Sequence, residues 1–167
     1  AALPQGVFVN HLVGGGDYRM LGPQDCARWY NQARVGLCLS EAEGAMYSSM
    51  EYLMCGQTVV STPSRGGRDY FFDAETALIV EPESAAVARG VRDMIDRRLE
   101  PEYVRRRTLE KVQAERRKLL DLLRLLFARA GRPFPGPQMW DSFFVNKMIE
   151  PVQTAELPYL VFHRRGN

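Results

Sequence analysis

Three short apolar runs, separated by segments of helical pattern, constrain the fold of this chain more than any other feature. The runs RVGLCLS (34–40), QTVVST (57–62) and TALIVEP (76–82) are bounded by polar or turn-forming residues, which is typical of strands buried on both faces. A further β-rich run, GVFVNHLV (6–13), ends at the glycines of GGGD. Short strands that alternate with helices predict an α/β fold, with βαβ units, a parallel sheet and helices on both of its faces.

Helical patterns occupy the gaps between these runs, at residues 22–33, 45–56 and 84–99. In the second of these segments, apolar side chains recur at i, i+4, i+7 and i+8 and form one stripe: Met46, Met50, Leu53 and Met54. Gly56 follows the stripe and is expected to end this helix. Ser84 is the expected N-cap of the third helix.

The chain changes character after residue 100. Residues 101–131 combine a leucine-rich helical face with many arginines, and the proline-rich stretch GRPFPGP follows. We expect one more helix at 138–151 and a short strand or extended segment at 157–162. The sequence therefore predicts two parts: an α/β domain over 1–100, and a C-terminal helical extension over 101–167 that packs on it.

Composition and net charge exclude several functional classes for this chain. The formal net charge of +2 on 167 residues does not indicate a nucleic-acid partner. No apolar run approaches the roughly 20 residues of a membrane span, and no leader pattern is expected at the N-terminus. Three cysteines, Cys26, Cys38 and Cys55, lack CxxC spacing and are predicted to be thiols in a reducing cytosol, not disulfides or zinc ligands. We expect a cytoplasmic globular protein.

Two glutamates with seven residues between them, Glu43 and Glu51, stand out in this framework. Glu43 follows the carboxyl end of the strand at 34–40, the edge of a parallel sheet where ligands bind. A helix that starts near Ala45 places Glu51 two turns in, roughly 9 Å along the axis, at the margin of the apolar stripe. The backbone N–H groups of residues 44–47 would then be free donors for a phosphate, and carboxylates suit the vicinal hydroxyls of a sugar.

Other interpretations of these residues stay open on spacing alone. Glu43 can simply favour the helix dipole, and Glu51 can be an ordinary surface residue of its helix. Arg65 and Arg68 flank a Gly-Gly pair, which either forms a phosphate-binding nest or is only a turn, with Asp69 opening the next helix.

The order of the motifs adds a resemblance to a known family. EGAMYSSMEYLMCGQTVVST (43–62), followed by GGRD and ALIVEP, resembles the donor-binding half of retaining GT-B glycosyltransferases, specifically glycosyltransferase family 4. That family carries an E-x7-E element, a Gly-Gly loop and a strand that ends in proline. The resemblance covers approximately residues 7–95. It implies that residues 1–100 form a partial Rossmann-like, nucleotide-sugar-binding domain, the C-terminal one of two domains that face each other across the active-site cleft.

The resemblance also implies roles for individual residues. Glu43 is implied to be the catalytic-site carboxylate, which contacts donor-sugar hydroxyls near the reacting centre, and Glu51 to accept hydrogen bonds from the nucleotide ribose. The loop after the first strand is implied to cradle the base, although a lone histidine there can equally be structural. The donor-binding residues predicted in this way are Glu51, Gly44, Ala45, Met46, Tyr47, Ser48, His11 and Gly14.

Among the departures of the chain from the family pattern, two concern the donor site directly. Met46 stands where the family usually has glycine, and we expect it to narrow the space beside the sugar. The family's basic pair for the donor diphosphate, and its acceptor-binding N-terminal domain, belong upstream of Ala1. We therefore interpret the chain as a fragment that is inactive alone.

The implied reaction transfers a sugar from a nucleotide-diphosphate sugar to an acceptor hydroxyl with retention, and the donor phosphate helps to deprotonate that hydroxyl. The resemblance implies no metal and no cofactor, and it leaves open whether the acceptor is a glycan, a lipid or a small molecule. The alternative function is a non-catalytic α/β module that docks a partner or a membrane surface through its basic, leucine-rich helices, mainly residues 105–129.

Overall fold

A computed structural model describes residues 21–138 of the chain. Its centre is a parallel sheet of β1 (Val35–Cys38), β2 (Thr58–Ser61) and β3 (Ala77–Ile79), in the order β1-β2-β3. In the pairing of β2 with β3, Val59 lies opposite Ala77. The predicted α/β fold with a parallel sheet is confirmed, and each strand falls inside the apolar run expected for it.

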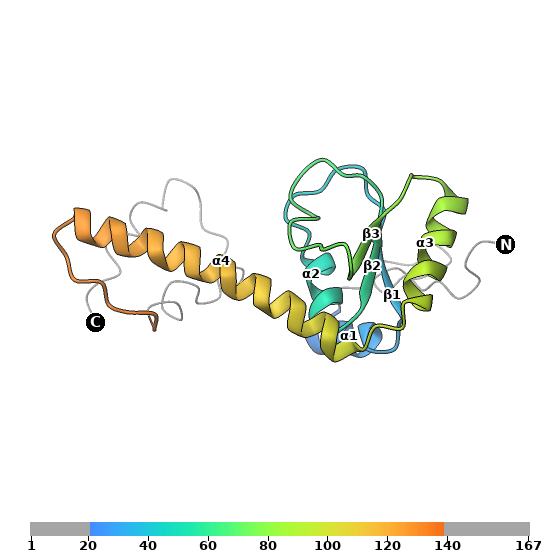
Figure 1. The fold of residues 1–167 in the computed structure, drawn as a ribbon, viewed down its shortest axis with the longest axis horizontal. Coiled ribbons are helices and arrows are strands. Elements are labelled where there is room, and N and C mark those ends of the chain that lie inside the picture. The colour runs from blue at the N-terminus through green and yellow to red at the C-terminus, as the bar shows by residue number, and fades with distance from the viewer. Residues whose placement is uncertain (1–20, 139–167) are drawn as a thin grey trace. The chain divides into compact units, whose positions relative to one another are not determined.

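Helices cover both faces of the sheet, as predicted (Figure 1). Neighbouring residues of β2 point to opposite faces, because side chains alternate along a strand. On one face lie α2 (Tyr47–Met54) and the start of α4 (Pro101–Arg129), with a core of Cys38, Leu53, Val59, Ala77 and Val104. On the other face lies α3 (Ser84–Asp96), with a core of Val60, Val87, Val91 and Met94.

The last residue of α1 (Pro23–Tyr30) contacts α2 and the residue that precedes β2. The Tyr30 ring meets the Tyr52 ring edge to face, with the centroids 4.8 Å apart. The Tyr30 carbonyl accepts a hydrogen bond from the Gln57 side chain. Tyr52 in turn lies directly over Gly36 of β1, where an added Cβ would be 2.3 Å from the ring. The aromatic pair therefore needs a glycine at this position of the strand.

Two helix starts differ from the prediction. The helix α2 begins at Tyr47, not near Ala45, because Met46 is extended and serves as the N-cap. The N-cap of α3 is Glu83, not Ser84, because the Glu83 carbonyl accepts the first helical hydrogen bond, from Val87 N–H at 2.9 Å. Neither helix has a side-chain cap.

The predicted helix after Asp69 is absent from the described part of the chain, and a series of turns joins β2 to β3 instead. The turn bond Phe72 N–H to Asp69 carbonyl, 2.9 Å, spans three residues and does not continue into a helix. Lys111 of α4 donates to the carbonyls of Phe71 and Phe72. This contact occupies backbone oxygens that a helix would have used for itself.

Glycines end two helices. Gly56 follows α2 with φ of 83°, and Gly131 follows α4 with φ of 65°, so both adopt the left-handed conformation that ends helices. A Cβ at Gly56 would lie 2.6 Å from Pro101, which shows how closely the end of α2 meets the start of α4.

Two compact units share the long helix α4. The structure divides into one compact unit over Ala1–Arg117 and another over Lys118–Asn167, so the first half of α4 belongs with the sheet. Val104 and Thr108 of that half are buried. The functional division at residue 100 stays a prediction. The expected elements at 6–13, 138–151 and 157–162 lie almost wholly outside the described residues.

Asp73 anchors α4 to the turns before β3. Its carboxylate accepts hydrogen bonds from the N–H groups of Glu75, at 2.9 Å, and Thr76, at 3.1 Å. The same side chain forms an ion pair with Arg107 at 3.3 Å. Burial opposes ionisation of Asp73, but these N–H groups and the charges of Arg107 and Lys111 outweigh it and hold the pKa of the carboxyl below its usual value.

Asp73 is therefore expected to make stability depend on pH on the acid side. Its folded pKa lies below the value of about 3.9 in an unfolded chain, so its contribution is complete above that value and is lost as the pH falls through the folded pKa. Asp73→Asn should flatten the acid limb of the unfolding free energy, measured with urea between about pH 2.5 and pH 6. An unchanged acid limb would show that Asp73 is not responsible.

Candidate functional site

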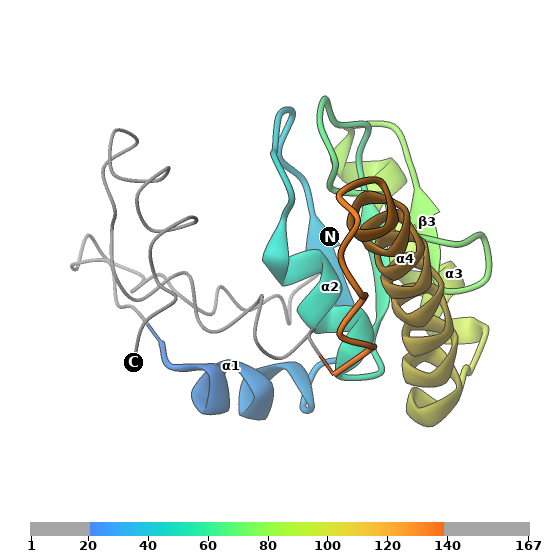
Figure 2. The ribbon, with the colours of Figure 1, turned by 90° about the vertical axis from the view of Figure 1, so that its left-hand side faces the viewer.

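Two loops that leave the carboxyl ends of β1 and β2 run side by side (Figures 1 and 2). The Glu43 N–H donates to the Arg65 carbonyl at 3.0 Å, and the Arg65 N–H donates to the Glu41 carbonyl at 3.0 Å. The Gly67 N–H donates to the Gly44 carbonyl at 3.1 Å. These three bonds fix the position of Glu43 against the Gly-Gly loop.

The conformation of Gly66 permits this contact. Its φ of 129° is strained for any residue with a side chain, and an added Cβ would lie 1.5 Å from the carbonyl oxygen of Glu43. The neighbouring Gly67 has no such restriction, because its nearest contact to an added Cβ is 3.7 Å. The two glycines of the motif thus have different roles.

A carboxylate and a row of backbone donors come together at the end of β1. Glu43 is half-buried, and within residues 21–138 its carboxylate has no hydrogen-bond or ion-pair partner. In the same part of the chain, the N–H groups from Gly44 to Ser48 donate no hydrogen bond. They surround the uncapped N-terminus of α2, where the helix dipole is positive. This arrangement suits an anion that also carries hydroxyl groups.

Glu51 lies in the second turn of α2 and is exposed. Its Oε2 accepts a hydrogen bond from the Tyr30 hydroxyl at 3.2 Å. Burial, reinforced by the negative charge of Glu51, raises the pKa of Tyr30 well above its usual value, so the hydroxyl stays a donor. No lysine or arginine of the described residues forms an ion pair with Glu51. The rest of the carboxylate stays open to ligand hydroxyls.

The structure places most of the predicted site residues together. Glu43, Gly44, Ala45, Met46, Tyr47 and Ser48 are consecutive, and Glu51 follows on the same helix. His11 and Gly14 lie outside the described residues. The side chain of Met46 packs against the core cluster under α2, as its place on the apolar stripe of the sequence predicts. The expectation that Met46 narrows the space beside the sugar stays a prediction.

The two arginines of the Gly-Gly loop have different environments. Arg65 is exposed and forms an ion pair with Glu41 at 3.0 Å. Arg68 is only 2% exposed and donates to the backbone carbonyls of Ser40, at 2.6 Å, and Thr62. The turn interpretation of the Gly-Gly pair is therefore closer to the structure than an open nest flanked by two arginines. Sequence reasoning missed the burial of Arg68, and no local pattern indicates it.

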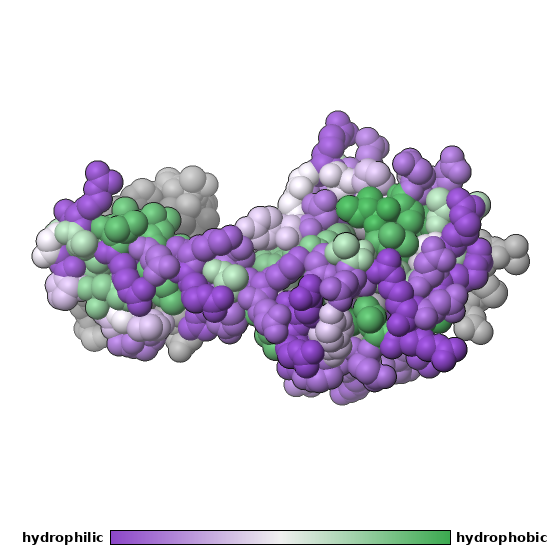
Figure 3. All heavy atoms as spheres, in the orientation of Figure 1, coloured by the Kyte–Doolittle hydropathy of each residue, from purple (hydrophilic) through white to green (hydrophobic). Residues whose placement is uncertain are grey.

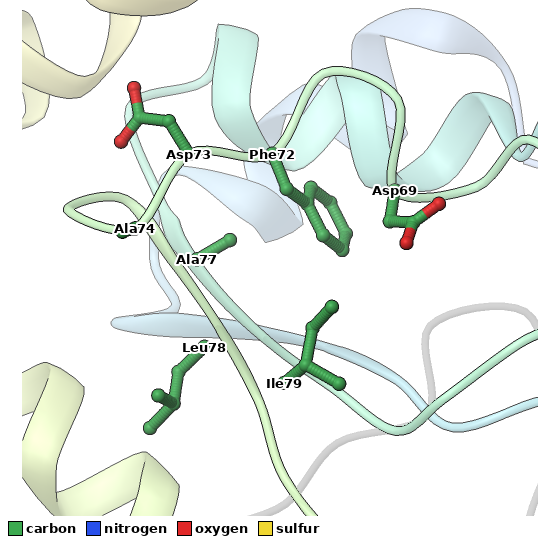
Figure 4. A pocket seen from close by; sticks show the side chains of 7 residues that line it. All are labelled: Asp69, Phe72, Asp73, Ala74, Ala77, Leu78 and Ile79. Carbon is green, nitrogen blue, oxygen red and sulfur yellow. The ribbon is translucent and has the colours of Figure 1, made fainter.

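A depression of about 410 Å³ lies beside β3, and Glu43 does not line it. Phe72 and Ile79 face each other across it, while the Asp73 carboxylate points away (Figure 4). Ile79 is 49% exposed, and an apolar area covers this part of the sheet (Figure 3). Its lining residues are Asp69, Phe72, Asp73, Ala74, Ala77, Leu78 and Ile79, which include none of the predicted site residues.

The three cysteines are free: Cys38 is buried, and Cys26 and Cys55 are half-buried. Burial raises the pKa of Cys38 to about 11, partly offset by the positive charge of Arg68, so it stays a thiol at neutral pH. Among residues 21–138, no three His, Cys, Asp or Glu side chains are grouped as a metal site would require. None of the helices in this range is long and apolar enough to cross a membrane.

Comparison with known proteins identifies the family. Residues 8–97, more than half of the chain, match the family described as glycosyl transferases group 1. The chain belongs to this family. The matched residues of this glycosyl transferases group 1 domain include Glu43, Glu51 and the Gly-Gly loop. The predicted family is confirmed.

Among solved structures, sucrose-phosphate synthase from Thermosynechococcus elongatus is similar to this glycosyl transferases group 1 chain. The two are 27% identical, with a TM-score of 0.44, and the match covers 60% of this chain and 27% of that enzyme. The chain thus spans about a quarter of the length of that relative. No curated protein matches the chain.

Proposed function

We propose that this domain binds a nucleotide-diphosphate sugar and forms the donor-binding half of a retaining glycosyltransferase with the GT-B architecture. The observation that carries the proposal is the partnerless Glu43 carboxylate beside the free N–H groups of residues 44–48, inside the family-matched region. Carboxylate acceptors suit sugar hydroxyls, and converging N–H groups suit a phosphate. One small site therefore has the chemistry for both parts of the donor.

The proposed reaction transfers the sugar to an acceptor hydroxyl on the face that the diphosphate leaves. The bond from the anomeric carbon to the diphosphate oxygen breaks, and a bond to the acceptor oxygen forms. The acceptor proton passes to the leaving diphosphate. N–H groups placed where the diphosphate gathers charge would lower the barrier, because they stabilise the leaving group most in the transition state.

Each glutamate has one part in this proposal. Glu43, next to the amides, binds the sugar hydroxyls near the anomeric carbon. Glu51, one turn along α2 and oriented by Tyr30, accepts from the ribose. The base and the acceptor would be held by segments outside residues 21–138 and by a second domain that faces this one across a cleft. The proposed donor site needs neither a metal nor a cofactor.

Titration of the purified protein tests the proposal. We expect one of UDP, GDP and ADP to bind with a dissociation constant between roughly 1 µM and 1 mM, and the corresponding nucleoside to bind far more weakly. Isothermal calorimetry or amide chemical shifts would measure both, and shifts should concentrate on residues 43–51. If none of the three diphosphates or their glucose, galactose and mannose forms binds, the proposal is wrong.

One observation supports the alternative function, which is docking of a partner or a membrane surface through the basic helix α4. Leu122, Leu125 and Leu126 of α4 are 51%, 64% and 50% exposed, and apolar atoms are visible on that half of the helix (Figure 3). These leucines lie outside the family-matched residues 8–97, so docking would accompany the transferase function instead of replacing it. Association with a membrane surface stays a prediction, which co-sedimentation with anionic liposomes would test.

A further inference from the structure

We propose that Arg68 is a positioning residue of the donor site, which holds both site loops and places a buried positive charge behind the N–H groups that receive the diphosphate. The inference rests on the proposed function and assigns a part of the donor site to a residue outside the E-x7-E element. The inference follows from three observations: the hydrogen bonds that the Arg68 guanidinium donates, the hydrogen bond that the Arg68 backbone carbonyl accepts, and the positive charge of the side chain.

The guanidinium of Arg68 joins the ends of two neighbouring strands. One terminal nitrogen donates to the carbonyl of Ser40, at 2.6 Å, and the other donates to the carbonyl of Thr62. Ser40 lies shortly after β1, where the Glu43 loop begins, and Thr62 follows β2 directly, where the Gly-Gly loop begins. One planar side chain with donors on both arms therefore fixes the separation of the two loops.

The backbone of Arg68 reaches a third element. The hydroxyl of Ser49, in the first turn of α2, lies 3.1 Å from the Arg68 carbonyl and 2.8 Å from the Met46 carbonyl. Ser49 is itself buried. Arg68 therefore contacts the start of the Glu43 loop, the Gly-Gly loop and the start of α2, which are the three segments that carry the candidate site.

The charge of Arg68 is buried without a counter-charge. Arginine stays protonated in proteins, and within residues 21–138 no carboxylate forms an ion pair with this guanidinium. Its Nε is buried and has no hydrogen-bond partner in the structure. Its neutral carbonyl partners leave the positive charge uncompensated, which is costly in a protein interior.

The positive charge of Arg68 lies close to the loops that carry the candidate donor site. The guanidinium of Arg68 donates to the carbonyl of Ser40, three residues before Glu43, and the Arg68 carbonyl accepts a hydrogen bond from Ser49 in the first turn of α2. An anion bound by the N–H groups of residues 44–48 would supply the missing negative charge nearby. The more charge the anion carries, the more it should gain from Arg68, which favours a diphosphate over a monophosphate.

Three variants separate charge from structure. Arg68→Lys keeps the charge but cannot bridge the carbonyls with a planar fork, whereas Arg68→Gln removes the charge and keeps hydrogen-bond donors. Arg97→Gln is the matched control, because Arg97 also donates to two carbonyls, of Ala74 at 2.7 Å and Glu75 at 2.8 Å, but is exposed and away from the site loops. Each variant is compared with the wild type in affinity for UDP, GDP and ADP and for the monophosphates, and in melting temperature.

We expect Arg68→Gln to lose roughly tenfold or more in diphosphate affinity, with a smaller loss for the monophosphate, and Arg68→Lys to lose about threefold. Arg97→Gln should bind as the wild type does. Equal losses in the two Arg68 variants, or wild-type affinity in Arg68→Gln, would overturn the inference while leaving the proposed function intact. A wild-type protein that binds no nucleotide would refute the proposed function itself.

If the Arg68 variants do not fold, a measurement on the wild-type protein tests the role proposed for Arg68. The buried Nε–H of Arg68 should give its own nitrogen–proton NMR signal. Saturation with the bound nucleoside diphosphate should move this signal, while the Arg97 signal stays in place. An Arg68 signal that does not respond to a diphosphate known to bind would rule the inference out.

Discussion

Gly66→Ala is expected to destabilise the protein by about 2–4 kcal/mol and to disrupt donor binding. The reason is local: a Cβ at this position would lie 1.5 Å from the Glu43 carbonyl oxygen, and the φ of 129° disfavours any side chain. The backbone of the Glu43 loop would have to move, and a shift of about 1 Å at a reacting centre can cost a hundredfold in rate. Urea unfolding and titration with the nucleotide sugar would measure the two effects.

Gly67→Ala is the matched control for this prediction. Its added Cβ would meet no atom closer than 3.7 Å, from the Gly44 carbonyl, and its φ lies outside the left-handed range. We expect unfolding and binding close to those of the wild type. Similar losses in both variants would mean that the motif needs flexibility at both positions, and the specific contact between Gly66 and Glu43 would lose its importance.

Alanine at Glu51 or Glu43 is expected to affect different parts of the donor. Glu51→Ala should lower the affinity for the nucleoside diphosphate itself by roughly tenfold to a hundredfold, because hydrogen bonds from the ribose hydroxyls to a charged carboxylate are lost. Glu43→Ala should lower only the affinity for the nucleotide sugar and leave the affinity for the nucleoside diphosphate within about twofold of the wild-type value. Calorimetric titration of each variant with both ligands measures the difference.

Two comparisons sharpen this second prediction. The wild type should prefer the ribonucleotide over its 2′-deoxy form, and Glu51→Ala should lose that preference. Glu41→Ala serves as the control, because Glu41 lies in the same loop but is exposed and pairs only with exposed Arg65. Equal losses for both ligands in the Glu43 and Glu51 variants would contradict the roles given to these residues.

Within residues 21–138, local sequence patterns were sufficient to predict the three strands and most of the helices. Each strand lies in a continuous apolar run, because both of its faces are covered by helices. The stripe that includes Met46 and Leu53 packs on the sheet, and Gly56 ends the helix, as their spacing predicts. The helix starts were one or two residues off, because the caps are backbone groups set by the neighbouring loops.

The site was only partly predictable. The proximity of Glu43 to the free N–H groups follows from a strand that leads into a helix, which is visible in the sequence. The hydrogen bond between Tyr30 and Glu51 joins residues 21 positions apart, and it depends on how α1 lies against α2. The packing of Met46 on the core follows from the apolar stripe, whereas its predicted effect on the sugar depends on a ligand and stays a prediction.

The sequence by itself determined the alternation of strands and helices, the place of the E-x7-E element at a strand end, and the family. Hydrophobic spacing and short motifs involve residues that are close in the sequence, so they can be recognised without the tertiary structure. Only the tertiary structure decided that Arg68 is buried between the ends of β1 and β2, and that Gly66 supports the Glu43 loop. The Ser40 partner of Arg68 stands 28 positions away, and a charged side chain gives no local sign of such a partner until the strands are paired.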